Sequence, residues 1–193
     1  MLNVIKLKPI VVFISLVLTQ IASLYAQDSL FYAEFGKIHI YHPVNKPNSL
    51  MLFVSGDGGW ELGVISMSKI LANQGALVAG IDAKYLKTSM AKEKNACLYP
   101  AGMFEDLSMM LQKKYKFQVY QKPILVGYSF GATLVYGLLA QAPAGTFKGG
   151  IALGFCPDIN ITKPLCKGSG LLSHALQPGK IYYLTWVRDK EKE

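Results

Sequence analysis

The sequence predicts an α/β domain with a mostly parallel sheet and helices on both of its faces. Short apolar runs without internal charge, typical of buried parallel strands, occur at residues 49–54, 76–81 and 123–126. Helix-like segments alternate with these runs at residues 62–73, 104–116 and 130–140. Right-handed crossovers would bring the loops after these strands to one edge of the sheet, where such folds bind ligands.

Other segments complete the expected sheet. Residues 30–35 and 37–42 alternate partly between apolar and polar side chains, which predicts two strands joined at Gly36. Later strands are expected at residues 149–155 and 180–187. Leu62, Ile65, Ile70 and Leu71 are expected on the buried face of the first helix, which Gly75 should end. Residues 82–100 are expected to form a loop.

Composition and charge limit the functional classes. Hydrophobic residues make up 51% of the 193 residues and charged residues 17%, which indicates a folded domain. The formal charge is +8, and two of these charges, Lys6 and Lys8, lie in the first 26 residues. The remaining lysines are scattered, without the basic stripe and interleaved aromatics of nucleic-acid binders. We therefore expect no nucleic-acid partner, and we keep contact with an anionic membrane surface as an alternative to an ordinary basic surface.

The first 26 residues resemble a secretory signal. Lys6 and Lys8 precede a nearly unbroken apolar run from Ile10 to Leu18, and Ala26 offers a cleavage site. A membrane anchor is the alternative, but the run is shorter than the roughly 20 residues that a span needs. We expect a signal peptide over residues 1–26, a domain over 27–193 and a periplasmic or otherwise exported protein.

Three cysteines, Cys97, Cys156 and Cys166, would then meet an oxidising compartment. Their spacing fits no zinc site, and we expect neither a metal nor a cofactor. Because Cys156 and Cys166 flank a short loop, we expect these two to form a disulfide and Cys97 to remain unpaired.

One motif carries the chemistry. Residues 127–131 read Gly-Tyr-Ser-Phe-Gly, directly after an apolar strand and before a helix. This is the context of a nucleophile elbow, in which a strained turn exposes the serine and the flanking glycines prevent a clash. Ser129 is the expected nucleophile. An ordinary strand–turn–helix with incidental glycines is the alternative.

A second motif follows an earlier strand. Residues 55–60 read Ser-Gly-Asp-Gly-Gly-Trp, where an oxyanion hole needs backbone amides. One donor would be the amide of Asp57 or Gly58, and the other the amide of Phe130, just after the nucleophile. A plain glycine-rich turn is the alternative. A phosphate-binding loop does not fit, because no Gly-Lys-Ser/Thr follows.

The two motifs together resemble the AcvB/VirJ group of exported bacterial virulence proteins. The resemblance runs from about Leu50 to Leu172 and is most specific over residues 55–60. It implies an α/β-hydrolase fold, a periplasmic location and a serine hydrolase. It also implies a link to type IV secretion components and a substrate such as lysyl-phosphatidylglycerol, an aminoacylated lipid.

The remaining members of a catalytic triad are less well placed. In this fold the acid and then the histidine follow the serine. After Ser129 the candidates are Asp158 and Asp189 for the acid and His174 for the base, although His174 precedes the last expected strand. In the family these groups lie in a C-terminal region without a counterpart here. We therefore expect an incomplete domain that lacks its C-terminal strand and helix.

Two functions remain open at this stage. The first is an exported serine hydrolase of the esterase type, acting on a small-molecule or lipid ester. The alternative is a non-catalytic periplasmic binding domain or type IV secretion accessory domain that keeps the fold without a complete triad.

Overall fold

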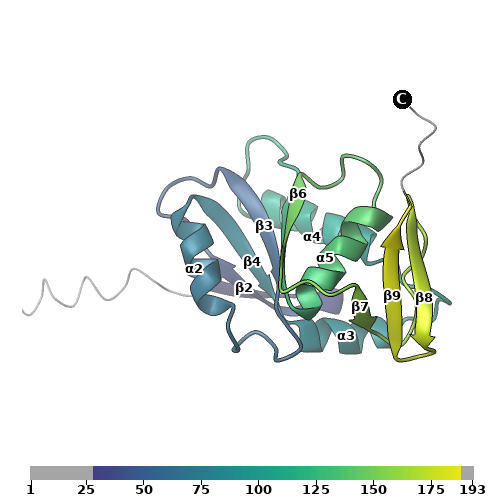
Figure 1. Ribbon diagram of the computed structural model, residues 1–193. Helices are drawn as coiled ribbons and strands as arrows, with labels where there is room; N and C mark the ends of the chain where they lie inside the picture. Colours follow the sequence, from purple (N-terminus) through teal and green to yellow (C-terminus); the bar gives the residue numbers. More distant parts are fainter. Residues whose placement is uncertain (1–27, 188–193) are drawn as a thin grey trace, which may run out of the picture.

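The computed structural model describes residues 28–187 and has the expected α/β architecture (Figure 1). A six-stranded main sheet has the order β1-β2-β4-β3-β5-β6. Its strands are β1 (Asp28–Tyr32), β2 (Gly36–Tyr41), β3 (Ser49–Val54), β4 (Ala76–Ile81), β5 (Ile124–Tyr128) and β6 (Gly149–Leu153). The last four are parallel, and β2 pairs antiparallel with both β1 and β4. A short 3-10 helix, η1 (Ala33–Phe35), joins β1 to β2.

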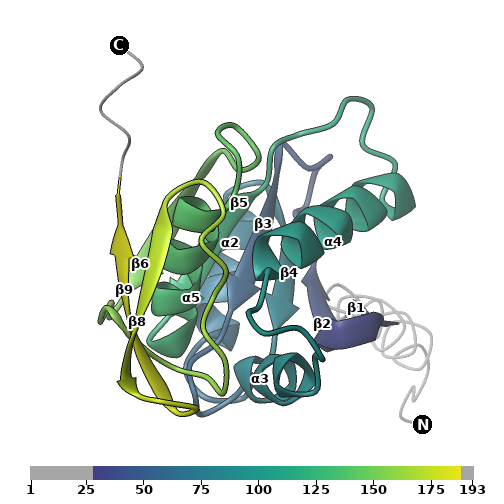
Figure 2. The ribbon, with the colours of Figure 1, turned by 90° about the vertical axis from the view of Figure 1, so that its right-hand side faces the viewer.

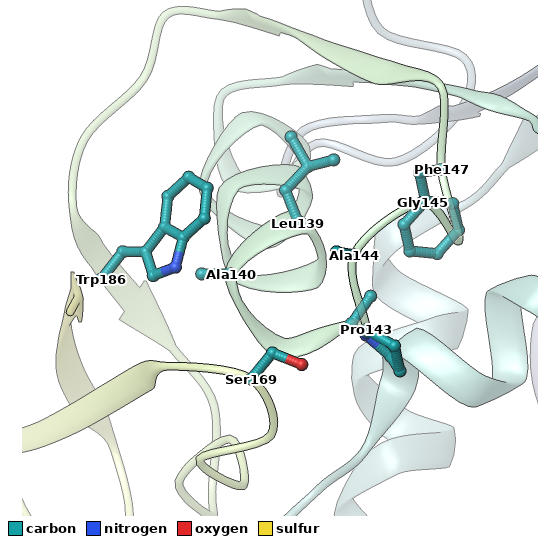
Figure 3. Close-up of a pocket in the computed structure, with 9 residues that line it drawn as sticks. Leu139, Ala140, Pro143, Ala144, Gly145, Phe147, Ser169 and Trp186 are labelled. Atoms are coloured by element: carbon teal, nitrogen blue, oxygen red, sulfur yellow. The ribbon is translucent and has the colours of Figure 1, made fainter. Parts of the chain in front are cut away.

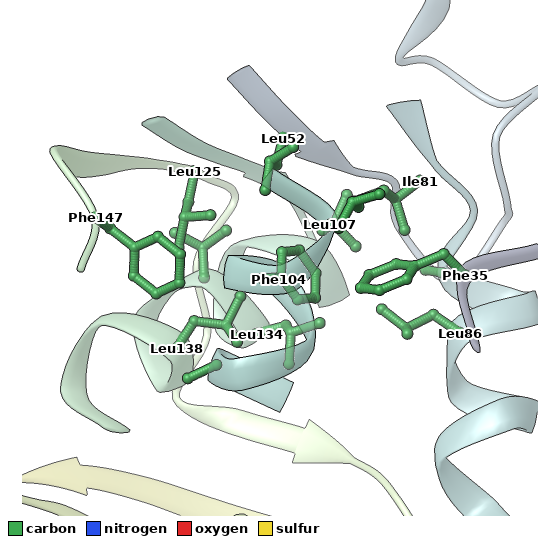
Figure 4. Close-up of a cluster of buried hydrophobic side chains, with 14 of the residues drawn as sticks. Phe35, Leu52, Ile81, Leu86, Phe104, Leu107, Leu125, Leu134, Leu138 and Phe147 are labelled. Carbon is green, nitrogen blue, oxygen red and sulfur yellow. The ribbon is translucent and has the colours of Figure 1, made fainter. Parts of the chain in front are cut away.

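Helices cover both faces of this sheet. Helix α2 (Ile65–Asn73) lies on one face, and α3 (Ala83–Ala91), α4 (Pro100–Lys114) and α5 (Phe130–Gln141) lie on the other (Figures 1 and 2). Neighbouring strand residues point to opposite faces, so Leu52 packs with α4 and α5 while Phe53 packs on the α2 side. The larger core, between the sheet and α3, α4 and α5, includes Phe35, Phe104 and Leu134 (Figure 4).

Helix α2 confirms only part of its expected buried face, because Ile65 and Leu71 pack partly buried against the smaller core whereas Leu62 and Ile70 do not. Leu62 and Ile70 are 64% and 59% exposed, and Leu62 precedes the helix. The buried positions are Val64, Ser68 and Ala72, spaced four residues apart. The Ser68 hydroxyl donates to the carbonyl of Val64, which satisfies it without solvent.

The segment expected as a loop contains a helix, α3. Its N-cap is Asp82, whose carboxylate accepts a hydrogen bond from the amide of Tyr85 at 3.0 Å. Leu86 and Met90 lie four residues apart and are fully buried in the larger core. An aspartate followed by Ala83, Leu86 and Met90 at helical spacing is the sequence signal for this helix.

The last expected strand forms, but outside the main sheet. It is β9 (Ile181–Trp186), the centre of an antiparallel sheet with β7 (Asp158–Asn160) and β8 (Leu171–Gln177). Only three residues separate β8 from β9, which suits a hairpin, whereas a parallel partner needs a crossover of a dozen or more residues. This small sheet packs against α5 through Leu184, which lies next to Gly137.

The disulfide also differs from the expectation. Cys97 pairs with Cys166, their Cα atoms 5.0 Å apart, and Cys156 is free and exposed. The carbonyl of Cys156 accepts from Thr133 in the first turn of α5, while the carbonyl of Cys166 accepts from Gln141 at its end. Eight residues of helix separate these contacts by about 12 Å, too far for a disulfide.

The expected signal peptide, residues 1–26, lies outside the described residues, as does Asp189. Within residues 28–187 no helix is both long enough and apolar enough to cross a membrane.

The disulfide between Cys97 and Cys166 can be tested by peptide mapping without reduction, which should find these two residues linked and Cys156 unmodified. Replacing Cys166 with Ser should lower the free energy of unfolding, by about 4 kcal/mol if the bond acts on the entropy of the unfolded chain. Urea unfolding measures the loss, with Cys156→Ser as the matched control that should unfold like the parent. A peptide that links Cys156 to Cys166 would contradict the observed pairing.

Candidate functional site

Ser129 occupies a sharp turn between β5 and α5. Its φ and ψ angles are 53° and −116°, a backbone conformation that residues other than glycine rarely adopt. The Ser129 amide donates to the carbonyl of Leu153 at 2.8 Å, which ties the turn to the end of β6. The residue is exposed. This geometry is that of a nucleophile elbow, as the sequence predicts.

Two glycines make the turn sterically possible. A Cβ atom on Gly127 would lie 2.1 Å from the carbonyl oxygen of Gly131. A Cβ on Gly131 would lie 2.2 Å from the carbonyl oxygen of Val54, at the end of β3. Real Cβ atoms do not approach backbone this closely, so the first turn of α5 can rest on β3 only because these side chains are missing.

The loop after β3 reaches the same place. A Cβ on Gly56 would lie 3.2 Å from the Cβ of Ser129. The amide of Gly59 donates to the carbonyl of Gly56 at 3.0 Å, and this turn does not use the amides of Asp57 and Gly58 between them. Phe130 begins α5, and the first amides of a helix have no partner within it. The three candidate amides for the two expected oxyanion donors therefore belong to two segments that meet at Ser129.

The ends of this loop are fastened to the start of α3. The hydroxyl of Ser55 accepts from the amide of Ala83 at 3.0 Å. The carboxylate of Asp82 accepts from the amide of Trp60 at 2.8 Å. Trp60 is buried beneath the loop, where its ring fills the space left by Gly80. Helix α3 is thus part of the frame of the site.

Lys87 of α3 contacts the middle of the loop. Its ammonium lies 2.7 Å from a carboxylate oxygen of Asp57 and 4.8 Å from the centre of the Phe130 ring. Lys87 is not among the site residues that the sequence predicts, because it falls in the segment expected to form a loop. The sequence offers one weak signal for its role in the site. Lys87 lies in the second turn of a helix that starts beside the glycine-rich motif.

The histidines of the chain are engaged elsewhere. His39 of β2 stacks on Trp60 with ring centres 5.2 Å apart, and its burial, with the nearby charge of Lys37, lowers the pKa of the imidazole. His42 contacts the carboxylate of Asp28 at 3.3 Å. His174 lies on β8, where its ring nitrogen is 3.0 Å from the hydroxyl of Thr185.

Asp158 begins β7 and is exposed, opposite Tyr183 of β9. The contacts of His39, His42 and His174 described above do not involve Asp158. Asp158 therefore stays a sequence prediction for the acid. In the described part of the chain, His, Cys, Asp and Glu side chains form no group of three that could hold a metal ion.

Two hollows flank these elements. One, of about 550 Å³, lies beside the loop and is lined by residues that include Trp60, Glu61, Asp82, Lys84 and Tyr85. The other, of about 530 Å³, is apolar and includes Leu139, Phe147 and Trp186 (Figure 3). This second hollow lies at the far end of α5, roughly 16 Å along the helix from Ser129, so it is not the site of the serine chemistry.

The sheet order, the covering helices and the elbow define an α/β-hydrolase-like domain. A family model for the bacterial virulence protein VirJ matches residues 48–147, which include both the loop and the elbow. The chain belongs to this family. Comparison with curated proteins by sequence finds no match.

Solved structures resemble the chain over part of its length. A thermostable carboxyl esterase from Bacillus coagulans is 22% identical, with a TM-score of 0.48 over 65% of this chain and 43% of that one. The Francisella virulence factor BioJ is 16% identical, with a TM-score of 0.44 over 68% and 48%. The esterase Est2 of Thermogutta terrifontis is 19% identical, with a TM-score of 0.44 over 67% and 51%. The chain thus spans about half the length of these structures or less.

Glycine substitutions test the packing at the elbow. We expect Gly127→Ala to destabilise the fold by more than about 2 kcal/mol, because its methyl group must displace backbone in the first turn of α5. Gly149→Ala is the matched control, since its methyl group would meet nothing within 4 Å. Urea denaturation of both variants measures the difference. Equal stability of the two variants would contradict the close approach of α5 to β5.

Proposed function

We propose that this protein is an esterase-type serine hydrolase with Ser129 as its nucleophile. The observation that carries the proposal is the strained, exposed position of Ser129 directly beside the glycine-rich loop. In the proposed reaction the hydroxyl oxygen of Ser129 attacks an ester carbonyl, the alcohol leaves, and water then releases the acid from the acyl-enzyme. Membership of the VirJ family supports this class of reaction.

The oxyanion formed by that attack would be held by two amides. The first belongs to Phe130, and the second to Asp57 or Gly58 across the site. Fixed donors of this kind are effective because they do not have to reorient during the reaction, and loss of one typically costs about 3 kcal/mol of barrier. The small size of Gly56 supports the proposal, because it lets the loop lie against Ser129.

The proton of Ser129 must pass to a base, and we do not assign that role to any of the three histidines. His174 is occupied by Thr185 on the small sheet, and His42 by Asp28. His39 packs on Trp60. Substitution of His42 or His174 with Gln should consequently leave the reactivity of Ser129 unchanged.

A fluorophosphonate probe tests the nucleophile. The serine oxygen displaces fluoride from phosphorus, and we expect the adduct on a single peptide that contains Ser129. Peptide mass spectrometry identifies the modified residue, and Ser129→Ala should remain unlabelled. Ser173→Ala is a matched control, because Ser173 donates to the carbonyl of Leu165 and should not react. Equal labelling of the parent and Ser129→Ala would sink the assignment.

We also propose the finer features that the family resemblance implies. These are export through residues 1–26, a periplasmic location and an aminoacylated phospholipid such as lysyl-phosphatidylglycerol as the substrate. Contact with type IV secretion components belongs to the same proposal. The hollow beside the loop is consistent with a substrate that has a charged head group, because the charged side chains of Glu61, Lys84 and Lys37 line it.

Vesicles that contain lysyl-phosphatidylglycerol test the substrate. Hydrolysis of its ester would release free lysine and leave phosphatidylglycerol, and amino-acid analysis measures the release. With a base in place beside Ser129, we expect lysine release and a loss of at least about a hundredfold in Ser129→Ala, since the nucleophile is removed. Ser129-dependent hydrolysis of a simple ester without any lysine release would reject this substrate and keep the enzyme class.

A non-catalytic binding or secretion accessory domain is the second candidate. The observation that favours it is the engagement of His39, His42 and His174 away from Ser129. This candidate predicts no selective labelling of Ser129 by the fluorophosphonate probe. The same experiment therefore separates the two functions.

A further inference from the structure

Lys87 is a charged side chain that contacts both segments of the proposed oxyanion hole. It forms an ion pair with Asp57 in the loop and lies over the ring of Phe130 at the start of α5. We propose that Lys87 is a positioning residue, which holds the middle of the loop against α5 so that the amides of the two segments face one point beside Ser129. This inference rests on the proposed function.

The loop needs such a contact at its middle. Its beginning is fixed through Ser55, and its end through the amide of Trp60. Asp57 and Gly58, which carry the proposed donors, are exposed. In the part of the chain that the structure describes, the side chain of Asp57 is tied by Lys87. Without this tie, the donors would depend on the Gly56–Gly59 turn alone.

The position of Lys87 suits this role physically. Its side chain is 26% exposed, so its ammonium is less screened by solvent than that of a fully exposed lysine. Phe130 is 5% exposed, and its ring lies beneath the ammonium, a contact that adds a cation–π attraction. Helix α3 is also hydrogen-bonded to both ends of the loop. Lys87 therefore contacts the middle of the loop from a helix whose position relative to the loop is already fixed.

The kinetic test uses Lys87→Met, which keeps the length of the stem and removes the charge. In a Ser129-dependent assay with an uncharged ester, we expect kcat to fall about tenfold, less than for outright loss of an oxyanion donor. KM should stay within about twofold, since a misplaced donor weakens the transition state more than substrate binding. Lys87→Arg should recover most of the rate, because a guanidinium can pair with Asp57 and stack on Phe130.

Two further variants sharpen this test. Lys69→Met makes the same chemical change on the exposed surface of α2 and should react like the parent. Asp57→Asn combined with Lys87→Met should be no slower than the slower single variant, because both changes break the same contact. Parent-like kcat in Lys87→Met, or an equal loss in Lys69→Met, would overturn the inference.

A structural readout keeps the inference separate from the proposed function. The amide of Gly59 closes the turn that Lys87 is proposed to hold. Hydrogen exchange at this amide should accelerate several-fold in Lys87→Met and stay unchanged in Lys69→Met. If the parent shows no Ser129-dependent reaction, the proposed function fails, and unchanged exchange at Gly59 would then also overturn the role of Lys87.

Discussion

The close approach of three backbone segments is the constraint on which the site depends. Gly131 places the first turn of α5 on the end of β3, and Gly127 lets β5 turn into that helix. Gly56 then brings the following loop against Ser129. A side chain at Gly127 or Gly131 would overlap backbone atoms and push α5 away from β5 and β3, and a side chain at Gly56 would crowd the Cβ of Ser129. The backbone packing at these glycines therefore determines where Ser129 lies relative to the loop amides.

Local sequence signals predict much of this arrangement. The apolar runs identify β3, β4 and β5, and the glycines around Ser129 identify the turn, because the steric demands of that turn are satisfied within five residues. The loop at residues 55–60 is predictable for the same reason. The resemblance of these two motifs to the AcvB/VirJ group agrees with the family match over residues 48–147.

Features that depend on distant contacts could not be predicted in this way. The pairing of Cys97 with Cys166 follows from the bridge between Leu98 and Leu165, which joins segments 67 residues apart in sequence. The small sheet forms because β8 and β9 make a hairpin instead of extending the main sheet. Lys87 reaches the site through a helix that reads as a loop, and its partners lie 30 and 43 residues away. Sequence spacing carries no information about such contacts.

We propose that Ser129 attacks the carbonyl carbon of the substrate while the amides of the two segments hold the oxygen of the same carbonyl group. An experimental structure of the Ser129 phosphonate adduct tests it most directly. We expect a phosphonyl oxygen about 2.7–3.1 Å from the amide nitrogen of Phe130 and at a similar distance from that of Asp57 or Gly58. A phosphonyl oxygen that points to solvent, without contact to the loop at residues 55–60, would contradict the account.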